Sequence, residues 1–226
     1  MIGNSGQTLL IFLGQIFLLY FVSRMVINDL FHVLRLFIRK ERIVFTIVTL
    51  LFLPGTIIHE LSHFIVAISL MLRVRDVSIF PKFQENYIRL GSVVYEKKDY
   101  IRGILVGIAP IFAGLFFFWF IGHFSLFNYG GTLLKVVLVY LVFVVSSTMF
   151  SSKQDLVDLV FVIPFIILII GIIYIFNINL ELIFKNQYLL NGILSFVGAV
   201  NRYLLFTILA NIGFITVFRM IKGVKR

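Results

Sequence analysis

The chain has 226 residues, 61% of them hydrophobic, and its mean hydropathy is +1.08. This composition excludes a soluble globular domain and predicts a polytopic membrane protein. The formal net charge is +10, which in a membrane protein sets orientation and attracts anionic lipid, so we expect the lipid bilayer and not nucleic acid as a partner. There is no cysteine, which leaves His, Asp and Glu as the strong metal ligands.

Apolar segments set the expected architecture, an all-α membrane protein with about six transmembrane helices. The segments are Thr8–Ile27, Ile43–Leu72, Ile101–Phe124, Thr132–Phe150, Val157–Phe176 and Leu190–Phe218. We expect one membrane domain over residues 1–226, with a central part at about 43–163 and peripheral helices at 8–27 and 190–218. Asn201-Arg202 interrupts the last segment, so 190–200 is expected partly in the interface, with the span starting near Arg202.

The second apolar segment contains His59-Glu60-Leu61-Ser62-His63. Histidines four residues apart lie on the same face of a helix, as two ligands of one Zn²⁺ require. A glutamate directly after the first histidine suits a general base that acts on a zinc-bound water. Ionisable groups at membrane depth are costly and indicate function. The sequence therefore predicts a hydrolytic zinc site, and the alternative is a pair of buried histidines bonded to neighbouring helices.

A catalytic zinc takes three protein ligands, and the third is expected from the polar break at 146–158 between two apolar helices. Asp155 is the first choice for this ligand. Asp158 is the second choice, or a partner of a ligand. The alternative is that Ser152 and Asp155 form a capping box at the start of the fifth helix.

The longest polar stretch follows the motif helix and predicts a β-hairpin near the membrane surface. Residues 73–80 and 86–95 are rich in β-branched and aromatic side chains, and 81–85 would form the turn. An exposed strand edge there could pair with an extended substrate segment. The alternative is a solvated loop that only connects two helices.

Small residues line one face of the third apolar segment and predict close packing against the motif helix. They are Gly103, Gly107, Ala109, Ala113 and Gly114. His32 and His123 each stand alone near a helix end, where packing is the expected role.

Basic residues in the short loops predict the orientation. If the N-terminus is cytoplasmic, the loop from Arg73 to Arg102 is inside and carries seven Lys or Arg, whereas the outside connections at 125–131 and 177–188 hold only Lys185. The expected arrangement has both termini and the active-site opening on the cytoplasmic side. The stretch Asn28–Arg42 disagrees, because it would lie outside with four basic residues, and we expect an interfacial or core-packed helix there.

Together the motif in an apolar helix, the following hairpin and the later aspartate resemble the site-2 protease family of intramembrane zinc metalloproteases. The resemblance covers about residues 43–163 and implies that this part is the catalytic core. It also implies a short, distant member without an accessory domain. It implies that His59, His63 and Asp155 bind zinc and that Glu60 activates the water. It also implies a bacterial cell membrane and a membrane-embedded or signal-peptide-like substrate.

The chain departs from the family pattern at several positions. Ser147 and Phe150 stand where the family has Asn and Pro before its aspartate, and Leu156 replaces the Gly that follows it. The helix after the hairpin has Ala109-Pro110 and Ala113 in place of Gly-Pro and Asn. These departures favour an alternative, a non-proteolytic zinc-binding sensor or scaffold. A transporter would show inverted repeats, and the sequence contains none.

Overall fold

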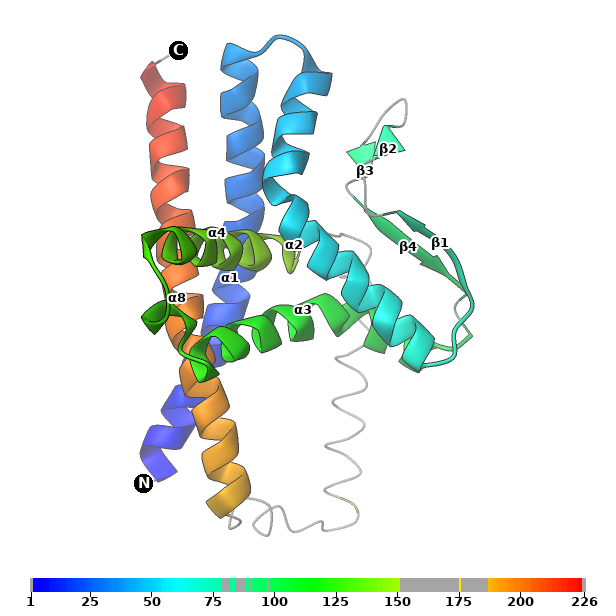
Figure 1. Cartoon of the computed structure of the whole chain (residues 1–226), viewed down its shortest axis with the longest axis vertical. Helices are drawn as coiled ribbons and strands as arrows, with labels where there is room; N and C mark the ends of the chain where they lie inside the picture. The colour runs from blue at the N-terminus through cyan, green and yellow to red at the C-terminus, as the bar shows by residue number, and fades with distance from the viewer. Residues whose placement is uncertain are drawn as a thin grey trace.

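The computed structural model describes residues 2–78, 82–83, 88–89, 91–96, 98–150, 175 and 187–224. Most of these residues are helical, as the sequence predicts (Figure 1). The helices are α1 (Ile2–Phe37), α2 (Glu41–Ser69), α3 (Tyr100–His123), α4 (Thr132–Thr148) and α8 (Gln187–Val224), with a short 3₁₀ helix at Leu126–Asn128. The expected segment Val157–Phe176 lies outside the described residues, apart from Ile175.

Four of the described helices, α1, α2, α3 and α8, are long and apolar enough to cross a bilayer. This finding fits a membrane protein with spanning helices. Helix α4 is equally apolar but has only 17 residues. In Figure 1, α3 and α4 lie across the long axis that α1 and α8 follow. The expected count of six spans is therefore not confirmed.

The first and last helices form a parallel pair. Asn201 Nδ2 donates to the Thr8 carbonyl at 3.4 Å, and Lys222 Nζ donates to Asp29 Oδ1 at 2.5 Å. In both contacts the two residues are 193 positions apart in the sequence. Helices α1 and α8 therefore keep the same register along about six helical turns. The start of α1 and the end of α8 consequently lie at opposite ends of the molecule (Figure 1).

Both long helices extend beyond the apolar segments that the sequence predicts. Residues 28–37 extend α1, with Asp29 and Val33 buried, so this stretch is core-packed and not a separate interfacial helix. Residues 190–200 extend α8 through Asn201-Arg202 without interruption. Asn201 Nδ2 bonds to the Thr8 carbonyl of α1, so this side chain lies within the helix pair. The interfacial position expected for 190–200 stays a prediction.

Helix α2 carries the motif and bends partway along its length (Figure 1). Pro54 lies inside this helix, and a proline inside a helix causes a kink. Just beyond the proline, Gly55 has no side chain and lets α4 approach closely. A Cβ at Gly55 would lie 2.7 Å from the Val144 carbonyl oxygen and would also collide with Thr148 Oγ1. The end of α4 is therefore held directly against the motif helix.

Helix α3 packs along the second half of α2, as its small residues predict. Gly103, Gly107, Ala109 and Gly114 are buried. Gly114 faces the end of α4, because a Cβ there would lie 2.6 Å from Met149 Sδ. The main apolar core lies between α1, α3, α4 and α8, and includes Leu19, Phe118, Val142 and Leu204.

The predicted hairpin after α2 is confirmed. Strand β1 (Val74–Ser78) pairs antiparallel with β4 (Ser92–Tyr95), and β2 (Lys82–Phe83) pairs with β3 (Ile88–Arg89). The expected turn at 81–85 was misplaced, because β2 lies within this range and pairs with β3. Arg75 Nε donates to Glu96 Oε1 at 2.9 Å across the base of the hairpin, and this bond lowers the pKa of the Glu96 carboxyl.

Candidate metal centre

The His-Glu-x-x-His motif lies in an unbroken helical stretch of α2, so its spacing places the two imidazoles on one face, one turn apart. All three functional side chains are buried, with relative exposures of 3% for His59, 7% for Glu60 and 6% for His63. Buried ionisable groups require partners, and the next contacts supply them.

His63 is oriented by the main chain of α3. Its Nδ1 lies 2.8 Å from the Val106 carbonyl oxygen, which can only accept, so Nδ1 carries the proton and donates. The tautomer is thereby fixed, with the proton on Nδ1 and the lone pair on Nε2. An imidazole held in this way by a backbone carbonyl is the usual arrangement of a metal-binding histidine.

The Nε2 atoms of His59 and His63 face each other at 3.2 Å, with the ring planes 84° apart. Two nitrogens bound tetrahedrally to one Zn²⁺ at about 2.0–2.1 Å would lie about 3.3–3.4 Å apart. The imidazole pair therefore fits zinc in the separation of its two Nε2 atoms. When no metal is bound, His59 Nε2–H can donate to His63 Nε2 across the same distance. The same geometry therefore also allows a hydrogen bond between the two imidazoles.

The hairpin covers the side chain of Glu60. A Cβ built on Gly91 would lie 2.6 Å from Glu60 Cγ and 2.7 Å from Oε1, so the main chain of Gly91 rests directly on this carboxylate. Ser62, also buried, donates from Oγ to the His59 carbonyl at 2.6 Å and stays within its own helix. The general base that the motif predicts is thus enclosed between α2 and the hairpin.

The proposed third ligand, Asp155, and its alternative, Asp158, lie outside the described residues. Within the described part, no three His, Asp or Glu side chains come together as a metal-binding group. The chain leaves α4 near the site, because Thr148 contacts Gly55, one helical turn before His59. The seven residues from Thr148 to Asp155 can span at most about 25 Å, which leaves the imidazole pair within their reach.

The other described histidines make local contacts that fit the packing role predicted for them. His32 Nδ1 lies 2.7 Å from the Asn28 carbonyl in its own helix. The His123 ring stacks on Trp119, with centroids 4.8 Å apart and planes 20° apart.

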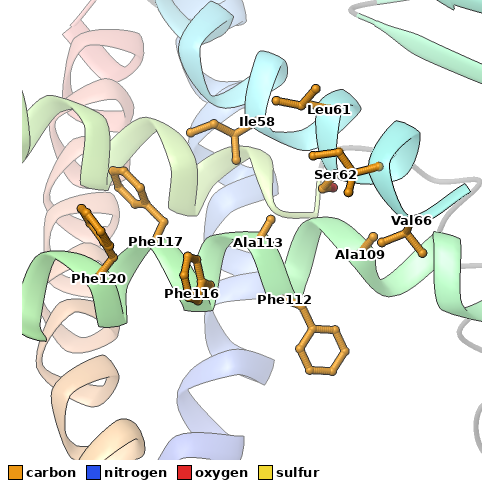
Figure 2. A pocket seen from close by; sticks show the side chains of 11 residues that line it. Ile58, Leu61, Ser62, Val66, Ala109, Phe112, Ala113, Phe116, Phe117 and Phe120 are labelled. Carbon is orange, nitrogen blue, oxygen red and sulfur yellow. The ribbon is translucent and has the colours of Figure 1, made fainter. Parts of the chain in front are cut away.

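An apolar groove of about 730 Å³ runs between α2 and α3 beside the motif (Figure 2). Ile58, Leu61 and Ser62 form the α2 wall, and the α3 wall carries Ala109 and Ala113 followed by phenylalanines. Phe112 and Phe116 are more than half exposed, so the groove opens to the surroundings of the protein.

The chain was compared with protein-family models, with curated proteins and with solved structures, and none of these comparisons found a match.

Two contacts of this centre were not predicted from the sequence. The Val106 carbonyl on His63 leaves no sequence signal, because any residue supplies a carbonyl. Gly91 is an isolated glycine within the stretch 86–95 that predicts a strand. Such a glycine indicates close approach of another chain segment but does not identify that segment.

Proposed function

We propose that the chain is an intramembrane zinc metalloendopeptidase that cuts a peptide bond in or near a transmembrane segment. The observation that carries this proposal is the imidazole pair, whose Nε2 atoms lie 3.2 Å apart with Glu60 next to His59 in the same helix. A resemblance to the site-2 protease family, based on the motif, the hairpin and the later aspartate, supports it.

In this proposal His59, His63 and Asp155 hold Zn²⁺, with Asp158 as the alternative third ligand. A zinc ion in such a site lowers the pKa of bound water and polarises a carbonyl. Glu60 takes a proton from the attacking water and returns it to the leaving amine. Burial of Glu60 at 7% exposure keeps bulk water from competing for that proton.

The surroundings of the motif suit an apolar substrate that must be locally unwound. The groove between α2 and α3 is lined almost entirely by apolar side chains, which matches a membrane-embedded segment or a signal-peptide-like remnant. The hairpin offers strand edges beside Glu60 where an extended segment can pair. A bacterial cell membrane as the location belongs to the same proposal.

The test is cleavage of a single-span substrate by purified protein in liposomes. Glu60→Gln keeps the shape of the side chain but removes the base, so cleavage should disappear while zinc is retained. Glu41→Gln, an exposed change at the start of the same helix, is the matched control and should cleave normally. Full cleavage by Glu60→Gln would refute the mechanism.

If the wild-type protein binds zinc but cleaves no member of a substrate panel, the alternative function is favoured. The chain would then be a zinc-binding sensor or scaffold that keeps the metal site. The departures from the family pattern around Asp155, such as Leu156 in place of glycine, are the observation that favours this second candidate.

A further inference from the structure

The hairpin and the motif helix meet at one point, where the main chain of Gly91 lies on the side chain of Glu60. A Cβ at Gly91 would come within 2.6 Å of Cγ, 2.7 Å of Oε1 and 2.9 Å of Cδ of Glu60. The three nearest atoms to this position all belong to Glu60. Any side chain at position 91 would therefore occupy the space of the carboxylate.

Space, and not backbone conformation, requires a glycine here. Gly130 is the glycine with a positive φ among the described residues, so Gly91 has a backbone that any residue could adopt. Gly91 is also half-buried and precedes Ser92, which is buried at 8% exposure. The glycine is thus needed for close approach of two chain segments.

The main chain directly after Gly91 is held by the sheet, whereas the Glu60 side chain can turn about its own bonds. Ser92 pairs with Ser78 and Val93 with Val77, so the strand cannot retreat without breaking this ladder. A methyl group at position 91 would consequently push the flexible carboxylate aside and leave the hairpin in place.

We propose that Gly91 is a positioning residue for Glu60, and that the bare main chain of the hairpin is the wall that aims this carboxylate. The role of Gly91 in catalysis rests on the proposed function, in which Glu60 is the general base. A base displaced by about 1 Å loses much of its effect, because proton transfer needs hydrogen-bond distance. The hairpin then has a role in the chemical step, separate from pairing with substrate.

The kinetic test is Gly91→Ala in the purified full-length chain, assayed with the single-span substrate in liposomes. We expect kcat to fall by roughly tenfold to a hundredfold, with KM within about twofold of wild type and zinc content unchanged. Gly131→Ala is the matched control, because a Cβ there meets nothing within 4 Å and its φ is −75°. A Gly91→Ala variant with unchanged kcat, or with a raised KM alone, would overturn the proposal.

A double-mutant cycle tests the same contact without any protease assay. Gly91→Ala should lower the melting temperature when Glu60 is present and should have a smaller effect in Glu60→Ala, which lacks all three colliding atoms. Equal shifts in both backgrounds would show that the two residues are not coupled and would overturn the contact. If the cycle shows coupling but the wild type cleaves nothing, the proposed function fails and the contact stands.

Discussion

The Nε2 atom of His63 lies 3.2 Å from Nε2 of His59, and the other ring nitrogen of His63 is bonded to the Val106 carbonyl of a different helix. A helix alone gives the spacing of two histidines, but it does not give their tautomers or ring directions. The bond to α3 supplies that second requirement for His63. His63 is therefore preorganised to present its Nε2 lone pair to a cation, and His59 Nε2 lies at the separation that one zinc ion requires.

Removal of either imidazole should abolish stoichiometric zinc binding. His59→Ala or His63→Ala leaves one described ligand, so we expect zinc affinity to fall beyond the roughly 10- to 100-fold that loss of an outer partner costs. Metal analysis of purified protein measures this. His123→Ala, which removes a ring stacked on Trp119, should keep its zinc. Zinc retained at wild-type affinity by both motif variants would place the ion elsewhere.

Separate substitutions of Asp155 and Asp158 should show which of the two aspartates binds zinc. We expect Asp155→Asn to lose zinc and cleavage, because an amide is a poor zinc ligand. Asp158→Asn should keep zinc and lose at most part of the activity. Zinc titration of both variants beside the wild type gives the answer, and the opposite pattern would assign the third ligand to Asp158.

Gly55→Ala should destabilise the fold by about 1–3 kcal/mol, since the new methyl group meets the backbone of α4. The collision involves the Val144 carbonyl oxygen at 2.7 Å, which cannot turn away as a side chain would. Thermal unfolding in detergent provides the measurement. Gly198→Ala is the control, because its Cβ meets nothing within 4 Å, and it should be neutral or stabilising by about 0.5–1 kcal/mol. Equal behaviour of the two variants would contradict the close packing of α2 and α4.

Filling the groove between α2 and α3 should impair cleavage of an apolar segment. Ala113→Phe places a ring among the lining side chains of this groove. We expect KM to rise several-fold, with zinc content unchanged, because neither proposed histidine ligand lines the groove. Leu209→Phe on α8, where the side chain is 60% exposed, is the control for an added aromatic ring. Unchanged KM in Ala113→Phe would exclude the groove as a substrate site.

The parallel pairing of α1 and α8 bears on orientation. If both helices span the bilayer, the start of α1 and the end of α8 lie on opposite sides, which argues against the prediction that both termini are cytoplasmic. The chain has no cysteine, so Gly6→Cys and Gly223→Cys each introduce a single label site. We expect a membrane-impermeant thiol reagent to reach these two sites from opposite sides of sealed vesicles. Labelling of both from the same side would contradict the parallel pair.

The sequence predicts the helical class, the motif helix and the hairpin, because each depends on a pattern of residues that are close together in the sequence. It does not predict that α1 and α8 lie side by side. Asp29 accepts from Lys222, and Asn201 Nδ2 donates to the Thr8 carbonyl, and in both contacts the partner is distant in sequence. Long-range satisfaction of a polar group leaves no local signal.

In the candidate site, too, some features follow from local sequence and others depend on tertiary contacts. His59, Glu60 and His63 follow from a five-residue motif, and the structure places the two imidazoles as that motif requires. The Val106 carbonyl and Gly91 come from segments that fold back on α2, so their roles depend on tertiary packing. Whether Asp155 or Asp158 completes the site stays a prediction.

Zinc binding by the two histidines is tested most directly by zinc X-ray absorption of the purified wild-type chain, beside the His59→Ala/His63→Ala double variant. We expect one zinc per chain, bound by two imidazole nitrogens at about 2.0–2.1 Å together with oxygen ligands. We also expect the double variant to lack this signal. A wild-type protein without zinc, or an imidazole signal that survives in the double variant, would contradict the central claim.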